Sequence, residues 1–196
     1  MSAQPQPRLT PAEYLAIERS AIDARHEFYR GEMFLMSGAS REHNLIAFNL
    51  SGLVGNALVD SGCEAYPADM RVKVDATGLY TYTDLVVTCE EPAFEDEHVD
   101  TLVNPQAIVE VLSPSTEAYD RGKKFEHFRG IPTLREYLLV AQDRPHIERY
   151  SLGDDGVWRL ADASGLGAAT AIETIGLTLP LADVYAKALP AGGDAG

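Results

Sequence analysis

The chain has 196 residues, of which 45% are hydrophobic, and this composition suits one globular domain with a sizeable core. Its formal net charge of -14 argues against general nucleic-acid affinity, because non-specific binding depends on phosphate neutralisation by Lys and Arg. No apolar run approaches the roughly 18–20 residues of a membrane helix, so we expect no membrane contact and a cytoplasmic location.

The two ends of the chain differ in composition from its middle. Residues 1–9 are rich in Pro and Gln without an apolar signal core, which predicts a disordered lead-in. Residues 190–196 are rich in Gly and Ala and predict a flexible tail. No internal repeat and no interdomain linker interrupts residues 10–189, which we expect to form a single domain.

The two cysteines, Cys63 and Cys89, lie in or beside predicted strands and lack the spacing of a Cys or Cys/His metal site. We expect buried, reduced thiols in a cytosolic protein, with a single disulfide as the less favoured alternative.

The first half of the chain predicts helices and short strands. Thr10, Pro11 and Glu13 have the spacing of N-cap, N1 and N3 residues, which predicts a helix to about residue 20. A hairpin is expected over 26–36, and near-helical apolar spacing predicts a long helix over 40–59. Short strands are expected at 63–67, 70–74 and 82–88, followed by a solvated acidic loop over 90–100.

The second half predicts a strand, a helix and another strand. Residues 107–112 are apolar on both faces apart from Glu110, which is typical of a central strand. A helix to about residue 129 and a buried strand at 136–140 follow, which predicts a parallel crossover. A hairpin (147–152 and 157–160), an edge strand (171–177) and a short helix (181–189) complete an α/β fold with a mixed β-sheet, flanking helices and added β-hairpins.

Two carboxylates inside hydrophobic runs carry the chemical signal of this sequence. Asp84 and Glu110 lie in predicted strands, where an ionised carboxylate costs several kcal/mol or more unless a counter-charge compensates it. If the two strands pair, both side chains can reach one cation, and oxygen ligands suit Mg²⁺ or Mn²⁺. The backbone carbonyl of Leu112 is a further candidate ligand.

A lysine follows these carboxylates on the next predicted helix. Lys124 lies four residues after Asp120, on the same helix face, and could orient an attacking water or stabilise charge on a phosphate. Lys123 points about 100° away and is expected in solvent. Taken singly, Asp84 also fits a strand-end aspartate, and the Asp120–Lys124 pair also fits a surface ion pair. The combination indicates a metal-dependent phosphodiesterase.

The order of these motifs resembles the PD-(D/E)XK nuclease superfamily and, more closely, the Uma-type family of restriction endonucleases. The resemblance covers about residues 10–185 and is most specific in its later half. The matching segments are residues 27–32, His43, 67–72, 83–87, 109–116, 120–124 and 136–140.

This resemblance implies a restriction-endonuclease-like α/β core that forms homodimers and binds a divalent metal. Asp84 and Glu110 would be the metal ligands, and Glu27 would match an acidic residue near the metal. Lys124 would be the catalytic lysine, displaced onto the helix from the position that Leu112 occupies here. Thr83 stands where the family has proline, which alters only local backbone rigidity.

Four further residues are candidates for binding substrate: His43, Asp69, Arg71 and Asp120. His43 could contact a phosphate or help assemble the site, and it equally fits a capped, partly exposed helix histidine. Asp69 and Arg71, two residues apart on a strand, also fit a structural ion pair.

Two functions from different classes follow. The first is a Mg²⁺-dependent endonuclease with DNA as substrate; a hydrolase of another phosphorylated substrate would use the same residues. The second is a non-catalytic homodimeric binding or regulatory module with a vestigial site. Local charge discriminates between them, because a basic cleft would attract DNA despite the global charge. The basic residues that could gather there are Arg25, Arg41, Arg71, Lys73, Arg121, Lys123 and Lys124.

Overall fold

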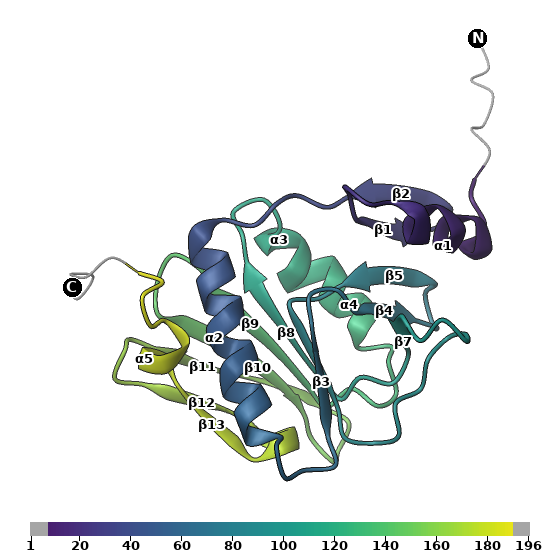
Figure 1. Ribbon diagram of the computed structural model, residues 1–196. Helices are drawn as coiled ribbons and strands as arrows, with labels where there is room; N and C mark the ends of the chain where they lie inside the picture. The colour runs from purple at the N-terminus through teal and green to yellow at the C-terminus, as the bar shows by residue number, and fades with distance from the viewer. Residues whose placement is uncertain (1–7, 190–196) are drawn as a thin grey trace.

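The computed structural model describes residues 8–189, in which β-sheets and flanking helices form a mixed α/β fold, as the sequence predicts (Figure 1). The predicted tail and most of the predicted lead-in lie outside the described residues. The helical segments are α1 (Pro11–Ser20), α2 (Arg41–Ala57), α3 (Glu117–Tyr119), η1 (Asp120–Lys124), α4 (Phe125–Phe128), η2 (Glu173–Ile175) and α5 (Leu181–Val184).

Two larger sheets organise the strands. A five-stranded sheet has the order β2 (Glu32–Leu35), β1 (His26–Tyr29), β5 (Leu79–Tyr82), β4 (Arg71–Val74) and β7 (Thr101–Leu102). A six-stranded sheet has the order β11 (Trp158–Ser164), β10 (His146–Leu152), β9 (Glu136–Ala141), β8 (Ala107–Leu112), β6 (Leu85–Thr88) and β3 (Glu64–Pro67). A separate hairpin joins β12 (Ala169–Ile172) to β13 (Leu177–Pro180).

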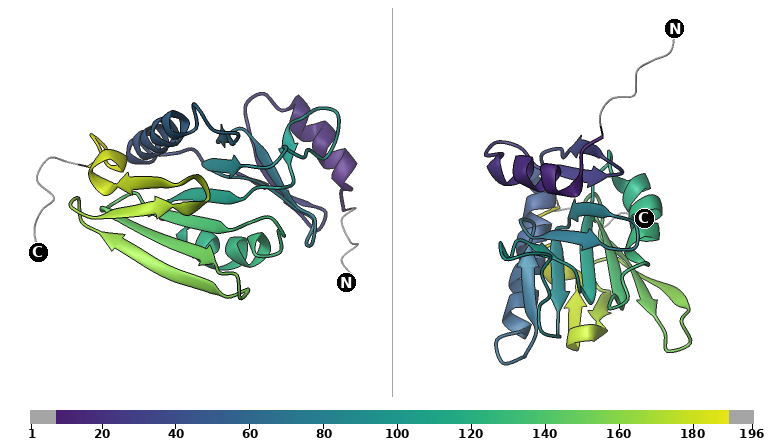
Figure 2. Two further views of the ribbon diagram at one scale, coloured as in Figure 1. Left: turned by 90° about the horizontal axis from the view of Figure 1, so that it is seen from below. Right: turned by 90° about the vertical axis from the view of Figure 1, so that its right-hand side faces the viewer.

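The centre of the six-stranded sheet is buried on both faces. β8 and β9 pair in parallel, which confirms the predicted crossover, and every residue of both strands is buried. Val109 and Val111 of β8 pack with α2, whereas Ile108 and Leu112 pack with α4 on the opposite face. The right panel of Figure 2 shows α2 and α3 on either side of the strands. Glu110 therefore shares the α4 face with Ile108 and Leu112, as its position in the strand predicts.

The expected strand over 82–88 is wrong, because the chain changes sheet within it. β5 ends at Tyr82 in the five-stranded sheet, and β6 begins at Leu85 in the six-stranded sheet. Thr83 and Asp84 form the link between the two sheets. The physical reason is that Asp84 is joined to β8 through its side chain: its carboxylate, rather than a backbone carbonyl, accepts the hydrogen bond from the β8 backbone.

The N-terminal α1, β1 and β2 form a layer that leans over one end of the molecule (Figures 1 and 2). The capping box at Thr10 and Glu13 is confirmed, with both reciprocal hydrogen bonds present. The acidic loop is a solvated charge run only in part: Glu90, Glu91 and Glu97 are exposed, as predicted, whereas other acidic residues form ion pairs. Asp100 and Asp96 bind Arg19 of α1, and Asp100 also pairs with Arg71 of β4. The loop thus fastens α1 to the five-stranded sheet, to which β1 and β2 already belong.

The C-terminal part departs from the prediction in length and type. The expected strand over 171–177 is interrupted by the short η2 helix, and the terminal helix has only the four residues of α5. The helix expected to reach residue 129 is continuous through α3, η1 and α4, but η1 has π-helical geometry.

The two cysteines are joined in a disulfide, so the expected reduced thiols are a wrong prediction. Cys63 directly precedes β3 and Cys89 directly follows β6. These antiparallel strands pair Glu64 with Thr88, which places the two cysteines opposite each other. The residues around each cysteine do not reveal how the two strands pair, so the disulfide could not be predicted from them. None of the helices within residues 8–189 is long and apolar enough to span a membrane.

Candidate active site

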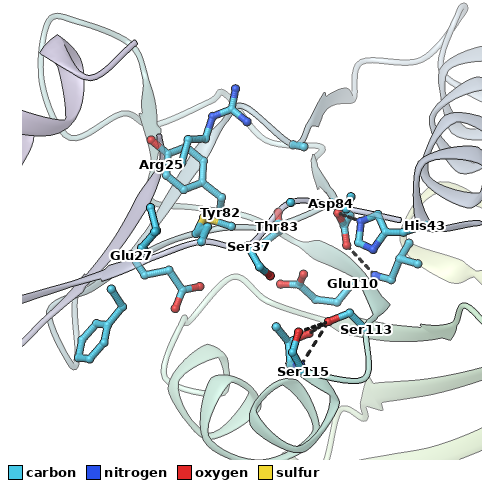
Figure 3. Close-up of a pocket in the computed structure, with 18 of the residues that line it drawn as sticks. Arg25, Glu27, Ser37, His43, Tyr82, Thr83, Asp84, Glu110, Ser113 and Ser115 are labelled. Carbon is cyan, nitrogen blue, oxygen red and sulfur yellow. Dashed lines mark hydrogen bonds and ion pairs between the residues drawn. The ribbon is translucent and has the colours of Figure 1, made fainter. Parts of the chain in front are cut away.

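A pocket of about 850 Å³ lies where the N-terminal layer, α2, the link between β5 and β6, and α3–η1 meet. Figure 3 shows carboxylates and hydroxyls from these elements pointing into it. The pocket brings together six of the nine residues predicted for the site: Glu27, His43, Asp84, Glu110, Asp120 and Lys124. Leu112, Asp69 and Arg71 do not line it.

Asp84 is held at the pocket by two hydrogen bonds from different elements. Its Oδ2 accepts from the backbone N–H of Val111 at 2.7 Å, and its Oδ1 lies 2.7 Å from Nε2 of His43. β6 and β8 pair with Leu85 beside Val109, so the residue before β6 comes opposite Glu110. The pairing of these two strands is the condition under which Asp84 and Glu110 were predicted to approach each other.

His43 reaches Asp84 because of the way α2 begins. Ser40 is the N-cap residue, and its side chain accepts from the backbone N–H of His43 at 3.0 Å. The imidazole is largely buried, and its Nδ1 has no hydrogen-bond partner among the described residues. His43 therefore orients Asp84 in this structure, and it also lies in the capped first turn of α2, as the alternative prediction expected.

Glu110 and Lys124 form a buried ion pair at the base of the pocket. Their Nζ and Oε1 atoms lie 2.8 Å apart, and the two side chains are only 5% and 6% exposed. Burial raises the pKa of Glu110 well above its ordinary value, although Lys124 acts against the shift. Glu110 thus favours a proton or a nearby cation over bare ionisation.

Lys124 leans back over the strand ends, as the sequence argument required. Its Nζ lies 3.4 Å from Glu27 and 3.7 Å from Asp120, and it donates to the carbonyl of Tyr82 at 3.0 Å. Burial alone would lower the pKa of Lys124, but attraction to Glu110, Glu27 and Asp120 outweighs burial and raises it. Lys124 is therefore a fully charged ammonium, and neighbouring Lys123 is solvent-exposed, as predicted.

The π-helical η1 carries both members of the Asp120–Lys124 pair into the protein. Both side chains are buried, so they are not the surface pair that their spacing also allowed. Burial raises the pKa of Asp120, with Lys124 and the hydroxyl of Thr116 acting in the opposite direction. π-Helical turns are frequent at functional sites.

Glu27 enters the pocket from β1 of the N-terminal layer. Its carboxylate accepts a hydrogen bond from Thr81 of β5 and lies close to Lys124. An acidic residue contributed by an N-terminal element is what the resemblance implied for this position. The N-terminal layer is thus one wall of the site.

Three predicted residues lie elsewhere. Leu112 packs its side chain in the core beneath α4. The predicted ion pair between Asp69 and Arg71 is wrong, because Asp69 is exposed and pairs with Arg25 at 2.5 Å. Arg71 is buried, where it pairs with Asp100 and donates to the hydroxyl of Tyr82. Asp69 lies in the turn before β4, and the turn directs its side chain away from that of Arg71, the first residue of the strand.

The charge inside the pocket is acidic. Of the seven basic residues considered from the sequence, only Arg25 and Lys124 line it. The others bind outside it: Arg41 to carbonyls near α5, Lys73 to Glu95, Arg121 to Glu148, Lys123 to Glu126 and Arg71 to Asp100. Five acidic residues line the same space: Asp23, Glu27, Asp84, Glu110 and Asp120.

The pocket gathers carboxylate oxygens, the donor type that hard divalent cations prefer. No group of three or more His, Cys, Asp or Glu side chains within residues 8–189 is arranged to hold a metal as the side chains stand. Nevertheless, one ammonium serves three nearby carboxylates, and the pocket retains excess negative charge. Oxygen ligands with a negative excess are what Mg²⁺ and Mn²⁺ prefer.

Tyr82 organises the site, although its sequence context predicted no role for it. Its carbonyl accepts from Lys124, and its hydroxyl donates to Glu18 at 3.0 Å. The signal that could have identified Tyr82 is its position two residues before Asp84. No comparable signal marks the apolar residues Ile22, Phe34 and Leu35, which line the pocket from the loop after α1 and from β2.

Comparisons with known proteins agree with this architecture. Residues 11–182 match the model of the Uma2 family, described as "Putative restriction endonuclease". The chain is 40% identical to protein sll1609 of Synechocystis sp. over 157 residues, covering 80% of this chain and 88% of that protein. It is 35% identical to protein slr1290 of the same organism over 181 residues, covering 92% and 93%.

A crystal structure from Anabaena variabilis, described as "a putative nuclease belonging to DUF820", superimposes with a TM-score of 0.74. The match covers 91% of this chain and 98% of that chain at 15% identity. At this identity the likeness concerns the fold, and it supports the expected restriction-endonuclease-like core.

Proposed function

This chain belongs to the Uma2 family, and we propose that it is a Mg²⁺- or Mn²⁺-dependent endonuclease that hydrolyses DNA phosphodiester bonds. The observation that carries the proposal is the convergence of Asp84, Glu110 and Lys124 in one pocket from three separate elements. Chance packing does not favour this cluster, because buried charges are costly unless they serve one another or a ligand.

Each residue has a role that follows from its surroundings. Asp84 and Glu110 would hold the metal, which supplies Lewis-acid stabilisation of phosphoryl charge when bound. His43 keeps the Asp84 carboxylate oriented by its hydrogen bond. Lys124 has a raised pKa, so it stays protonated and would bind a negative phosphoryl oxygen or orient water rather than act as a base.

Asp120 and Glu27 support the lysine from two sides. Each lies within 4 Å of its ammonium group, and together with Glu110 they fix its position over the strand ends. Their remaining charge would also strengthen cation binding in the pocket. Preorganised charge of this kind is the main means by which enzymes stabilise phosphoryl transfer.

A DNA-cleavage assay tests the proposal. We expect wild type to nick supercoiled plasmid with Mg²⁺ or Mn²⁺ and to be inactive in EDTA. Asp84→Asn, Glu110→Gln and Lys124→Met should each lower the rate by about 100-fold or more, the usual cost of removing one such group. Lys123→Met and Glu126→Gln are matched controls, because these residues form an exposed pair outside the pocket.

Calorimetry with Mn²⁺ separates metal binding from cleavage. Saturable binding in wild type that disappears in a folded Asp84→Ala/Glu110→Ala double variant would support the ligand assignment. Equal binding in both proteins, or plasmid left intact by a metal-loaded wild type, would contradict the endonuclease proposal.

A second candidate is favoured by the acidic pocket. A homodimeric binding or regulatory module with a vestigial site needs no phosphate-attracting cleft, and within residues 8–189 only two basic residues line this one. Light scattering on the purified protein tests the expected dimer. A dimer that neither binds Mn²⁺ nor cleaves DNA would favour this candidate.

The endonuclease proposal also implies a cytoplasmic protein with access to DNA. The Cys63–Cys89 disulfide removes one reason for that expectation, because disulfides are typical of oxidising compartments. Fractionation of cells expressing the tagged protein tests the location directly.

A further inference from the structure

Arg25 is the only arginine among the described residues that line the pocket. Its side chain is 49% exposed, so its guanidinium is open to a ligand. Figure 3 shows it beside Tyr82, with its nitrogens directed away from Glu27 and Glu110. Lys124, the other cation of the pocket, is buried and already surrounded by carboxylates. Arg25 is therefore the cation that an incoming anion can reach.

The aromatic ring of Tyr82 supports Arg25. The guanidinium carbon lies 5.7 Å from the ring centroid, within the range of a cation–π contact. The ring is held in place because its hydroxyl donates to buried Glu18 and accepts from buried Arg71. The carbonyl of the same residue accepts from Lys124. Tyr82 thus positions both cations of the pocket, one through its ring and one through its backbone.

Asp69 holds the outer end of Arg25. Its Oδ1 lies 2.5 Å from the guanidinium, and its side chain is 77% exposed. Exposed ion pairs contribute little free energy, so a better anion can replace this carboxylate. A phosphate is such an anion, because the planar guanidinium fork matches two phosphate oxygens.

We propose that Arg25 binds a backbone phosphate of the polynucleotide at the rim of the pocket, and that Asp69 holds the guanidinium in place until the phosphate displaces it. The proposal rests on the proposed function for the identity of its ligand. Arg25 contacts a phosphate that flanks the reacting one, so it contributes to substrate affinity rather than to the chemical step. The five acidic residues of the pocket repel DNA, which makes one accessible cation at the rim important for docking.

The experiment measures affinity by fluorescence anisotropy with a labelled DNA duplex, in Ca²⁺ buffer and over a series of NaCl concentrations. A gel confirms that the duplex stays intact. Arg25→Gln should weaken binding about tenfold and reduce the slope of log K against log salt by about one, the signature of one lost phosphate contact. Arg25→Lys should keep the slope and recover part of the affinity.

Arg30→Gln is the matched control. Arg30 is also an exposed arginine of the N-terminal layer stacked on a tyrosine, 5.0 Å from the ring centroid of Tyr29, but it does not line the pocket. We expect wild-type affinity and slope from this variant. Asp69→Asn should tighten binding about two- to fivefold, because it frees the guanidinium.

Three outcomes overturn the proposal: unchanged affinity in Arg25→Gln, an equal loss in Arg30→Gln, or no binding by wild type. Urea midpoints of all variants identify any loss that comes from unfolding. Binding that depends on Arg25 without any cleavage in Mg²⁺ would support this inference while contradicting the proposed nuclease activity.

Discussion

At the scale of single residues, the site is a problem of charge compensation. Glu110, Asp120 and Glu27 are each close to the same ammonium group, and that group is almost fully buried. Removing one partner of a buried ion pair costs more than removing both, because the remaining charge has no compensation. The members of this cluster should therefore show strong coupling in double-variant experiments.

Lys124→Met should destabilise the metal-free protein by about 3 kcal/mol, because it leaves Glu110 buried without its counter-charge. Lys124→Met/Glu110→Gln should recover most of that loss, while Lys123→Met should change stability by less than about 0.5 kcal/mol. Urea unfolding in EDTA measures all three. Equal stability of the single and double variants would mean that Glu110 gains nothing from Lys124.

At the scale of secondary structure, the site forms where the chain passes from one sheet to the other. Asp84 follows the end of β5 and precedes β6, so it can turn toward the backbone of β8. In a continuous strand over 82–88, the residues on both sides of Asp84 would pair within a single sheet. At the other end of β6, the disulfide between Cys63 and Cys89 joins this strand to β3.

The disulfide closes a loop with a sequence separation of 26 residues, and a loop of this size is expected to contribute about 3–4 kcal/mol. Reduction with dithiothreitol, or a Cys63→Ser/Cys89→Ser double variant, should lower the free energy of unfolding by that amount. Urea titrations of oxidised and reduced protein measure it. If mass spectrometry finds two free thiols in the native protein, the bond does not form.

At the scale of the whole molecule, the site depends on the N-terminal layer staying in place. Glu27 and Arg25 belong to that layer, whereas Asp84, Glu110 and Lys124 belong to the central sheet and its helix. Asp100 holds α1 of this layer against the five-stranded sheet, because it binds Arg19 of α1 and Arg71 of β4. Arg19, together with Arg71 and against the effect of burial, lowers the pKa of Asp100.

Asp100→Asn should lower the free energy of unfolding at pH 7 by about 1–2 kcal/mol, a modest value because the carboxylate is one-third exposed. A lowered folded-state pKa stabilises the protein above the unfolded value of 3.8 and loses that contribution as the pH falls below it. The difference between wild type and variant should therefore shrink in acid. Asp75→Asn, which alters an exposed carboxylate that pairs with Lys73, is the control. A difference that stays constant down to about pH 2 would contradict this account.

Local patterns in the sequence predicted several parts of the molecule correctly. The capping box at Thr10 and the buried run of β8 are contained in short segments, and the parallel crossover follows from the order of three elements. The positions of Glu110 on one strand face and Lys124 on the following helix were also predictable. These features depend on periodicity and capping, which neighbouring residues alone determine.

Only the tertiary structure decided which distant residues meet. The pairing of Cys63 with Cys89, the choice of Arg25 rather than Arg71 as the partner of Asp69, and the split of residues 82–88 between two sheets all depend on strand register. Register is set by the packing of the whole core, since a shift of one residue exchanges the two faces of a strand. By itself, therefore, the sequence determined which residues are candidates for the site, and the fold decided which of them share the pocket.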